Sequence, residues 1–269
     1  MSGPKVSVVI GSYNCEKFIH ETVQSVIDQT FRDWELIIVD DCSTDNTCQE
    51  ISRIKDERIK LIRLDSNSGL PAAPRNVGIK NAKGDYIAFL DHDDIWLPEK
   101  LERQVAFLEK NKDIFLSYTK CIIQKDGKQL KTNPQKPKAG RIFKDLFLNS
   151  NFIDVMTVMI RNRREDNFYF FDEDRCLAAV EDYALWLEIS LKEKISFIDQ
   201  SLSIYRVHPG GLSKGAFSHF KKCRSVIKKF SPFVSKRLLL QAYINFYATL
   251  LNIGVFVSLM NIKRYLKKP

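Results

Sequence analysis

The segment Tyr86-Ile87-Ala88-Phe89-Leu90-Asp91-His92-Asp93-Asp94 joins an apolar run to a cluster of carboxylates. A short apolar run bounded by polar residues predicts a buried strand. In open α/β sheets, the residues just beyond the carboxyl end of a strand line the ligand site. Carboxylate oxygens suit Mg²⁺ or Mn²⁺, and such an ion would reconcile this cluster with an anionic diphosphate. An acidic turn after a strand also caps helices, so the surrounding sequence has to decide between a ligand site and a cap.

Strand-like segments alternate with helical segments through the first part of the chain. The predicted strands are residues 6–10, 34–39, 59–64 and 86–90, and the predicted helices are residues 16–29, a helix that follows caps at 43–45, and residues 72–82. This alternation requires right-handed crossovers and a largely parallel sheet. The sequence therefore predicts an α/β, Rossmann-like fold with a mixed, mainly parallel sheet flanked by helices. Residues 1–110 would form its nucleotide-binding half.

The next part of the chain, residues 111–214, carries more varied elements. We expect a strand at residues 114–124, a hairpin turn at Asp126-Gly127 and an amphipathic helix at residues 177–191. Residues 131–140 are polar and rich in turn formers, which predicts a mobile loop. Together with the first half, these elements complete one domain of residues 1–214.

The C-terminal tail, residues 215–269, is predicted to be a basic amphipathic helical appendage. Residues 200–269 contain 13 Lys and Arg and no Asp or Glu, whereas the whole chain has a net charge of +9. Such a helix favours an anionic membrane surface as its partner. The alternatives are packing on the domain or on a second subunit, which would give a homodimer, and a membrane span by residues 238–260. No aromatic stacking platform accompanies the basic residues, so we expect no nucleic-acid partner.

The six cysteines are scattered and form no C-x-x-C pair. This pattern indicates neither a zinc site nor a disulfide framework. No apolar secretory segment opens the chain. We therefore expect a cytoplasmic protein, which would be peripheral at the cytoplasmic face of the inner membrane if the tail docks there.

Acidic residues recur where apolar segments end or helices begin. They are Asp40-Asp41, Asp91 with Asp93 and Asp94, and Glu181-Asp182. In a parallel sheet the first two groups come to the same edge, so they would share one ligand.

Six motifs, taken in their order along the chain, resemble the inverting GT-A glycosyltransferases of family 2. They are V-S-V-V-I-G-S-Y-N (6–14), I-V-D-D-C-S-T-D (38–45), N-S-G-L-P-A-A-P-R-N-V-G (67–78), G-D-Y-I-A-F-L-D-H-D-D (84–94), E-D-Y-A-L-W (181–186) and Y-R-V-H (205–208). Each motif alone is weak, but the ordered set spans about residues 5–215. The resemblance implies a GT-A fold in which residues 111–214 bind the acceptor. Two residues depart from the family pattern. Thr or Pro usually occupies the position of Gly11, and Gly usually occupies the position of Cys42.

For the donor nucleotide, the resemblance implies contacts by Tyr13, Asp40 and Asp41. Asp41 would accept a hydrogen bond from a ring N–H of the base, and Tyr13 would stack on that base. Uracil, thymine and guanine offer such an N–H but neutral cytosine does not, and a UDP-sugar is favoured. Ordinary packing of Tyr13 and helix capping by Asp40 are the alternatives.

For the metal and the diphosphate, Asp91 and Asp93 match the acidic positions of the family's Asp-x-Asp motif. The resemblance implies that Asp93, with Asp91, binds Mg²⁺ or Mn²⁺ at the donor's diphosphate. Arg75 and His208 would lie near the phosphates or the metal, and a structural role is the alternative for both.

Inverting transfer needs a base beside the acceptor hydroxyl. Asp182 matches the family's catalytic position, and Glu181 would be its neighbour. A pair of acids that only stabilises a helix N-terminus is the alternative.

The sequence therefore predicts a glycosyltransferase that moves a sugar from a nucleotide-diphosphate-sugar donor to a hydroxyl of a glycan or lipid-linked acceptor. One alternative is a non-catalytic nucleotide-sugar-binding or scaffold protein of a polysaccharide assembly complex. The other is a sugar nucleotidylyltransferase, although residues 11–14 lack the Gly-rich basic loop that such an enzyme needs.

Overall fold

The computed structural model describes residues 3–134, 136–163, 169–211 and 216–265. For residues 216–221, 250 and 252–265 it describes the backbone alone. The expected boundary between the domain and the tail, at residues 214 and 215, lies outside the described residues.

Four parallel strands form the predicted nucleotide-binding half. β1 (Val6–Ser12), β2 (Trp34–Asp40), β3 (Ile59–Arg63) and β4 (Tyr86–Phe89) lie in the order β3-β2-β1-β4. Between them run α1 (Ile19–Ile27), α2 (Thr47–Arg53) and α3 (Ala72–Asn81). All three pairings in this half are parallel, as the alternating sequence pattern predicted.

The second half makes the sheet mixed. β8 (Met159–Arg161) lies antiparallel between β4 and β6 (Ile114–Lys125). β9 (Lys194–Val207) runs parallel to β6, and its far end pairs with β5 (Ile95–Trp96). The hairpin predicted at residues 126–127 joins β6 to β7 (Lys128–Asn133). The loop predicted for residues 131–140 was therefore wrong for residues 131–133, because their backbone groups pair with β6.

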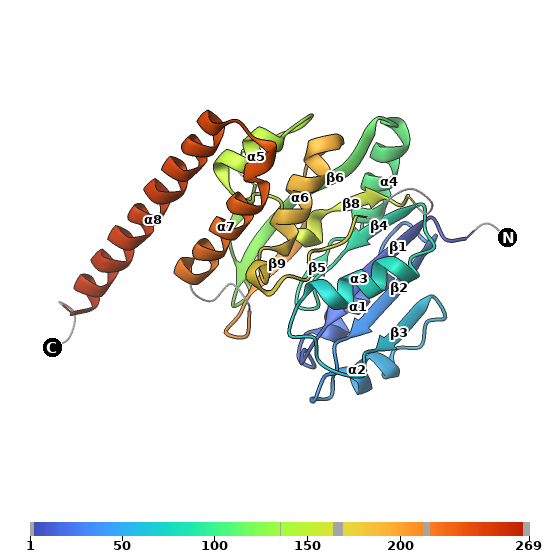
Figure 1. Cartoon of the computed structure of the whole chain (residues 1–269). Coiled ribbons are helices and arrows are strands. Elements are labelled where there is room, and N and C mark those ends of the chain that lie inside the picture. Colours follow the sequence, from blue (N-terminus) through green and yellow to red (C-terminus); the bar gives the residue numbers. More distant parts are fainter. Residues whose placement is uncertain (1–2, 135, 164–168, 212–215, 266–269) are drawn as a thin grey trace.

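Helices cover both faces of the sheet (Figure 1). Along β1, Val6, Val8 and Ile10 join a core with α1 and with α4 (Lys100–Lys110), whereas Val9 joins the core on the opposite face. The second core contains residues of α3, α5 (Phe143–Asn149), α6 (Glu181–Lys192) and α7 (Ala216–Phe230). The alternation of side chains along a strand thus produces two buried layers around one sheet.

Helix α6 begins later than the sequence pattern predicted. The expected helix of residues 177–191 is preceded by a separate 3-10 turn at Arg175–Leu177, and α6 starts at Glu181. Ala179 has a φ of 66°, in the left-handed region, so one right-handed helix cannot pass through it. Two further 3-10 turns lie at Val155–Thr157 and Ser231–Phe233.

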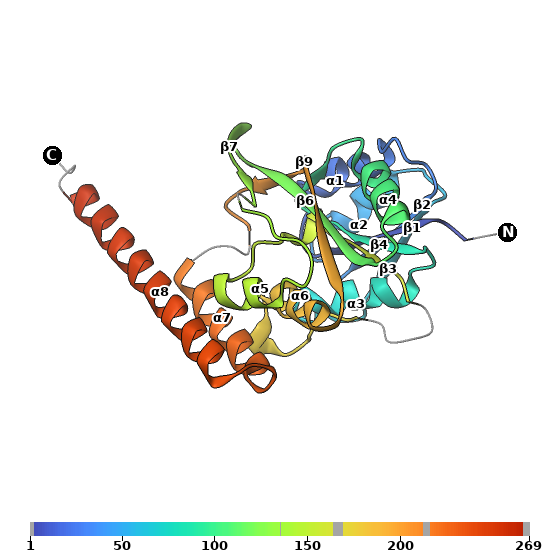
Figure 2. The same ribbon diagram turned by 90° about the horizontal axis from the view of Figure 1, so that it is seen from above.

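The tail forms α7 and the long helix α8 (Lys236–Tyr265), which lie side by side at the end of the molecule opposite β3 (Figures 1 and 2). Ala242 and Phe246 pack one face of α8 on the domain. Another face presents exposed apolar side chains of Leu240, Ile244 and Leu251. In the described part of the chain, we find no helix with the length and apolar character needed to cross a membrane.

Candidate active site

The first two acidic groups meet at one edge of the sheet, as predicted. Asp40 ends β2 and lies in register with Ser12, the last residue of β1. Asp91 follows β4, which pairs with the other side of β1. Parallel pairing therefore brings both acidic turns to the carboxyl ends of adjacent strands.

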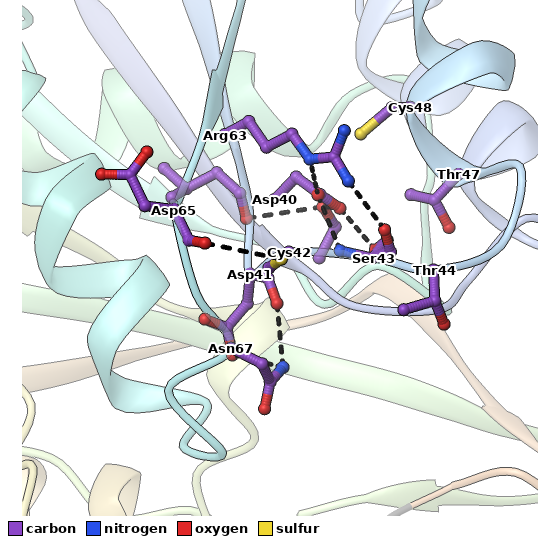
Figure 3. A network of polar contacts seen from close by, with 12 residues as sticks. Asp40, Asp41, Cys42, Ser43, Thr44, Thr47, Cys48, Arg63, Asp65 and Asn67 are labelled. Carbon is purple, nitrogen blue, oxygen red and sulfur yellow. Dashed lines mark hydrogen bonds and ion pairs between the residues drawn. The ribbon is translucent and has the colours of Figure 1, made fainter.

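Asp40 is completely buried and contacts its own turn (Figure 3). Its carboxylate accepts hydrogen bonds from the backbone N–H and the hydroxyl of Ser43. Arg63 Nε lies 3.6 Å from the same carboxylate. Asp40 does not cap α2, which begins at Thr47 after Asn46; its contacts hold the turn that carries Asp41.

The carboxylate of Asp41 is anchored by the segment after β3 (Figure 3). Oδ1 accepts the N–H of Ser68 at 2.9 Å, and Oδ2 accepts the Ser68 hydroxyl at 2.8 Å and Asn67 Nδ2 at 3.1 Å. An ionised oxygen accepts more than one hydrogen bond, so Oδ1 retains capacity for another donor. Tyr13 is 42% exposed at the end of β1.

Cys42 adopts a left-handed conformation, with φ of 59°. This backbone region favours glycine, which explains why the family pattern usually has Gly at this position. The thiol lies 3.9 Å from the backbone oxygen of Asp65, so it packs in the turn (Figure 3).

Arg75 joins the donor-side acids to the acids of α6. Its Nη2 donates to Asp91 Oδ1 at 2.6 Å, and its Nη1 donates to Glu181 Oε1 at 2.7 Å. Burial alone would lower the pKa of Arg75, but the charges of Asp91 and Glu181 outweigh it and raise that pKa. Burial raises the pKa of Asp91, although the guanidinium opposes the shift. The third acidic group, Glu181-Asp182, therefore lies in the same site as Asp91.

Asp93 pairs with His208 from the end of β9. His208 Nε2 lies 2.9 Å from Asp93 Oδ2, and its Nδ1 accepts the N–H of Gly210 at 3.1 Å. Because Nδ1 accepts, Nε2 carries the ring proton and donates it to Asp93. The ring also packs on Phe18, with centroids 4.3 Å apart.

Arg206 fixes the end of β9 against the acidic turn. Its backbone N–H donates to Asp94 Oδ1 at 2.9 Å, and its guanidinium donates to the backbone oxygen of Asp93 and to Glu21. Asp94 is buried, and this burial, with the charges of Asp93 and Asp91, raises its pKa well above the usual range. Asp94 therefore acts as an anchor for the turn.

The residues around Asp93 fit a divalent cation that also binds a diphosphate. Among the described side chains, no three His, Cys, Asp or Glu residues form a preformed metal cage. Asp93 and His208 lie together, and His208 Nε2 would become a ligand if a bound cation took the place of its proton. Mg²⁺ typically takes one or two carboxylates and completes its shell with water and substrate phosphates, so a partial protein site of this kind suits it.

Asp182 lies at the N-terminus of α6, partly exposed. Its Oδ2 accepts Asn151 Nδ2 at 2.9 Å, and its Oδ1 accepts the N–H of Tyr183 at 2.7 Å. Burial, followed by the charge of Glu181, raises the pKa of Asp182 to about 7. A carboxylate with this pKa takes up a proton readily at neutral pH, as a general base must.

Three contributors to the site were not predicted from the sequence. Asn151 holds Asp182 and has no motif of its own. Arg206 and Ser68 lie inside two of the quoted motifs, so their positions could have been noted, but their partners Asp94 and Asp41 are distant in the sequence.

Comparison with known proteins identifies the class. The model of the family described as Glycosyl transferase family 2 matches residues 7–168. The chain belongs to this family, and it is a glycosyltransferase with the GT-A fold.

Two relatives come from Escherichia coli. WfaP, named UDP-Glc:alpha-D-GlcNAc-diphosphoundecaprenol beta-1,3-glucosyltransferase, is 36% identical over 242 residues, which cover 88% of this chain and 91% of WfaP. WfgD, which has the same descriptive name, is 34% identical over 84% of this chain and 86% of its own length. Among solved structures, S. aureus TarS 1-349 in complex with UDP has a TM-score of 0.64 and 27% identity. That match covers 83% of this chain and 65% of the TarS chain.

Proposed function

We propose that this protein transfers a sugar from a UDP-sugar to a hydroxyl of a lipid-linked saccharide or other glycan, with inversion at the anomeric carbon. The observation that carries the proposal is the pairing of Arg75 with both Asp91 and Glu181, which unites the predicted donor acids with the predicted base. The names of WfaP and WfgD support a UDP-sugar donor and a lipid diphosphate acceptor.

The donor nucleotide would bind at the ends of β1 and β2. Tyr13 stacks on the base, and Asp41 accepts a ring N–H at the free position of its Oδ1. Asp40 supports this contact from beneath, because its bonds to Ser43 fix the turn. The UDP complex of TarS supports uracil as the base.

The diphosphate would lie at the acidic turn after β4. Asp93 and His208 would hold Mg²⁺ or Mn²⁺, with the second oxygen of Asp91 as a further ligand. When bound, the cation neutralises the charge that grows on the departing diphosphate. Arg75 adds a fixed positive charge at the same place.

Asp182 would serve as the base. It takes the proton of the acceptor hydroxyl while that oxygen bonds to the anomeric carbon and the bond from this carbon to the diphosphate breaks. Asn151 and the N–H of Tyr183 orient the carboxylate toward its task. The negative charge of Glu181 raises the pKa of Asp182 and so makes Asp182 a stronger base.

The replacement Asp93→Asn tests this assignment. We expect sugar transfer measured with Mn²⁺ to fall about a hundredfold or more, because a charge-stabilising ligand is lost. Asp113→Asn is the matched control, since Asp113 is exposed and pairs with Lys194 away from the site. Unchanged turnover of the Asp93→Asn protein would remove the metal site from the proposal.

We also infer that the tail docks on an anionic membrane surface, which would place the enzyme beside a lipid-linked acceptor. The exposed apolar side chains of α8 and the excess of basic residues after residue 199 support this inference. A homodimer through the C-terminal helices is the competing arrangement. Binding to vesicles that contain anionic lipid is expected for docking and not for a homodimer that buries this face.

A further inference from the structure

A cavity of about 310 Å³ lies between α5, α7 and α8, outside the site described above. Phe147, Ile227 and Phe246 give it an apolar lining. Asn149, Ser150 and Asn245 add polar groups to the same wall. A mixed lining of this kind suits a ligand that is itself part apolar and part polar.

Two residues that line the cavity lie next to the predicted base or to its hydrogen-bond partner in the sequence. Tyr183 lines the cavity, and its own backbone N–H donates to Asp182. Ser150 also lines the cavity, and the next residue, Asn151, donates to the other oxygen of Asp182. The cavity therefore lies next to the two segments that hold the Asp182 carboxylate.

Two of the helices that line the cavity, α7 and α8, carry exposed basic side chains. Arg224 and Lys228 are exposed on α7, and Lys236 and Arg237 are exposed at the start of α8. No Asp or Glu occurs in the chain after residue 199. An anionic group attached to an apolar chain would be attracted to this end of the molecule.

We propose that this cavity is a subsite for the acceptor, which binds the apolar chain of a prenyl diphosphate that carries the acceptor sugar. The inference rests on the proposed function and deepens it, because it places one part of the acceptor. The chain lies against α5, α7 and α8, its diphosphate faces the basic residues, and its sugar points to Asp182.

The variant Ala248→Trp fills the cavity at its rim, where Ala248 is exposed and a larger side chain leaves the core intact. Leu240→Trp is the matched control. It places the same side chain on α8 at an exposed position that does not line the cavity. Thermal unfolding of both variants verifies that they fold like the wild type.

Binding is measured first, by calorimetry with farnesyl diphosphate, which carries a prenyl chain and a diphosphate but no sugar. We expect the wild type and Leu240→Trp to bind alike, and Ala248→Trp to bind about tenfold more weakly because apolar contacts are lost. Equal binding by all three proteins, or no binding by any of them, would overturn the subsite.

Transfer is measured second, with two acceptors that share one sugar diphosphate and differ in carrying a prenyl chain or a methyl group. We expect Ala248→Trp to raise KM for the prenyl acceptor alone. If the wild type uses both acceptors equally well, the subsite is refuted while the proposed function stands. If it uses neither acceptor although it binds farnesyl diphosphate as expected, the proposed function fails instead. A dimer that Ala248→Trp converts to monomers would show that a second copy covers the cavity, which also refutes the subsite.

Discussion

Asp182 shows how its surroundings change the chemistry of a single carboxyl group. An ordinary aspartic acid is too weak a base to take a proton at neutral pH, whereas burial and the neighbouring Glu181 raise the pKa of Asp182 to about 7. The hydrogen bonds from Asn151 and Tyr183 favour the charged form and limit that rise. The balance suits proton uptake near physiological pH.

The pH dependence of transfer follows from this pKa. Because the base acts in its ionised form, we expect kcat/KM to rise with pH and to level off above about 7. Asn151→Ala removes a donor to the carboxylate and should move this limb upward by about half a unit to one unit. Asn111→Ala, which removes a side-chain amide that donates to the backbone oxygen of Phe107 at the end of α4, should leave the limb in place. A limb that stays in place in Asn151→Ala would argue against Asp182 as the base.

The raised pKa of Asp182 also makes the free energy of unfolding depend on pH. The folded-state pKa of Asp182 lies above the model value of 3.8, so its contribution to stability is present below pH 3.8 and is lost as pH rises through about 7. We therefore expect Asp182→Asn to be the more stable protein at pH 8, by about 2 kcal/mol after allowance for partial exposure. Urea unfolding at pH 5 and pH 8 checks the sign. A stability difference that stays constant between these pH values would contradict the raised pKa.

At the residue scale, the sequence indicated candidate acids but not what holds them, and the functions of these acids stay predictions. The meeting of Asp91 with the Glu181-Asp182 pair was implied only by the family resemblance, and the structure adds the contact through Arg75. Asn151 could not have been found, because its partner is 31 residues away and neither residue type nor spacing marks it. The roles of Tyr13, Asp40, Asp41 and His208 toward the donor stay predictions.

Among the elements, β9 does most to assemble the site. It pairs with β6 along most of its length, and its far end pairs with β5. This second pairing carries Arg206 and His208 to the turn after β4. One long strand therefore connects the second half of the domain to the donor side.

Helix α3 packs so closely on β1 that one position requires glycine. A Cβ on Gly78 would clash with Cγ1 of Val9, because the two atoms would be much closer than van der Waals contact allows. Alanine would gain about 0.5–1 kcal/mol of helix propensity, but overpacking costs about 1–3 kcal/mol, so we expect Gly78→Ala to be less stable by about 1 kcal/mol. Urea unfolding measures the change, and Lys80→Ala on the exposed side of α3 is the control. A gain in stability for Gly78→Ala would show that β1 yields to the added methyl group.

At the scale of elements, the parallel half could be predicted because each strand there is followed by its own crossover helix. The sequence pattern therefore fixed both the type and the direction of β1 to β4. The antiparallel insertion of β8 could not be predicted, because a three-residue strand carries almost no periodicity. The pairing of β9 with β5 depends on contacts more than a hundred residues apart.

Basic and acidic residues are distributed unevenly between the two ends of the chain. The basic excess lies in the part of the chain that forms α7 and α8, whereas the acids that build the site come from residues before 200. The sequence predicted this division and the helical tail. The packing of Ala242 and Phe246 on the domain, which leaves another face of α8 exposed, needed the structure.

Membrane docking is tested on this exposed face. Leu240 and Ile244 lie one turn apart and are 62% and 52% exposed. We expect the double replacement by Glu to reduce binding to vesicles that contain anionic lipid about tenfold or more, because two apolar contacts become charges that repel the surface. Leu130→Glu is the control, since Leu130 is 59% exposed on β7, which lies apart from α8 (Figure 2). Co-sedimentation at low and high salt measures binding. Equal loss in the control would argue against docking by α8.

The position of Arg75 has a consequence for how the two substrates influence each other. Its guanidinium is shared between Asp91, which follows β4, and Glu181, which neighbours the proposed base Asp182. Any ligand that draws the guanidinium toward one carboxylate changes the charge balance at the other. Thermodynamic reciprocity then requires that a donor which alters acceptor affinity has its own affinity altered by the same factor. Under the proposed function, this one side chain would couple the binding of the donor to the binding of the acceptor.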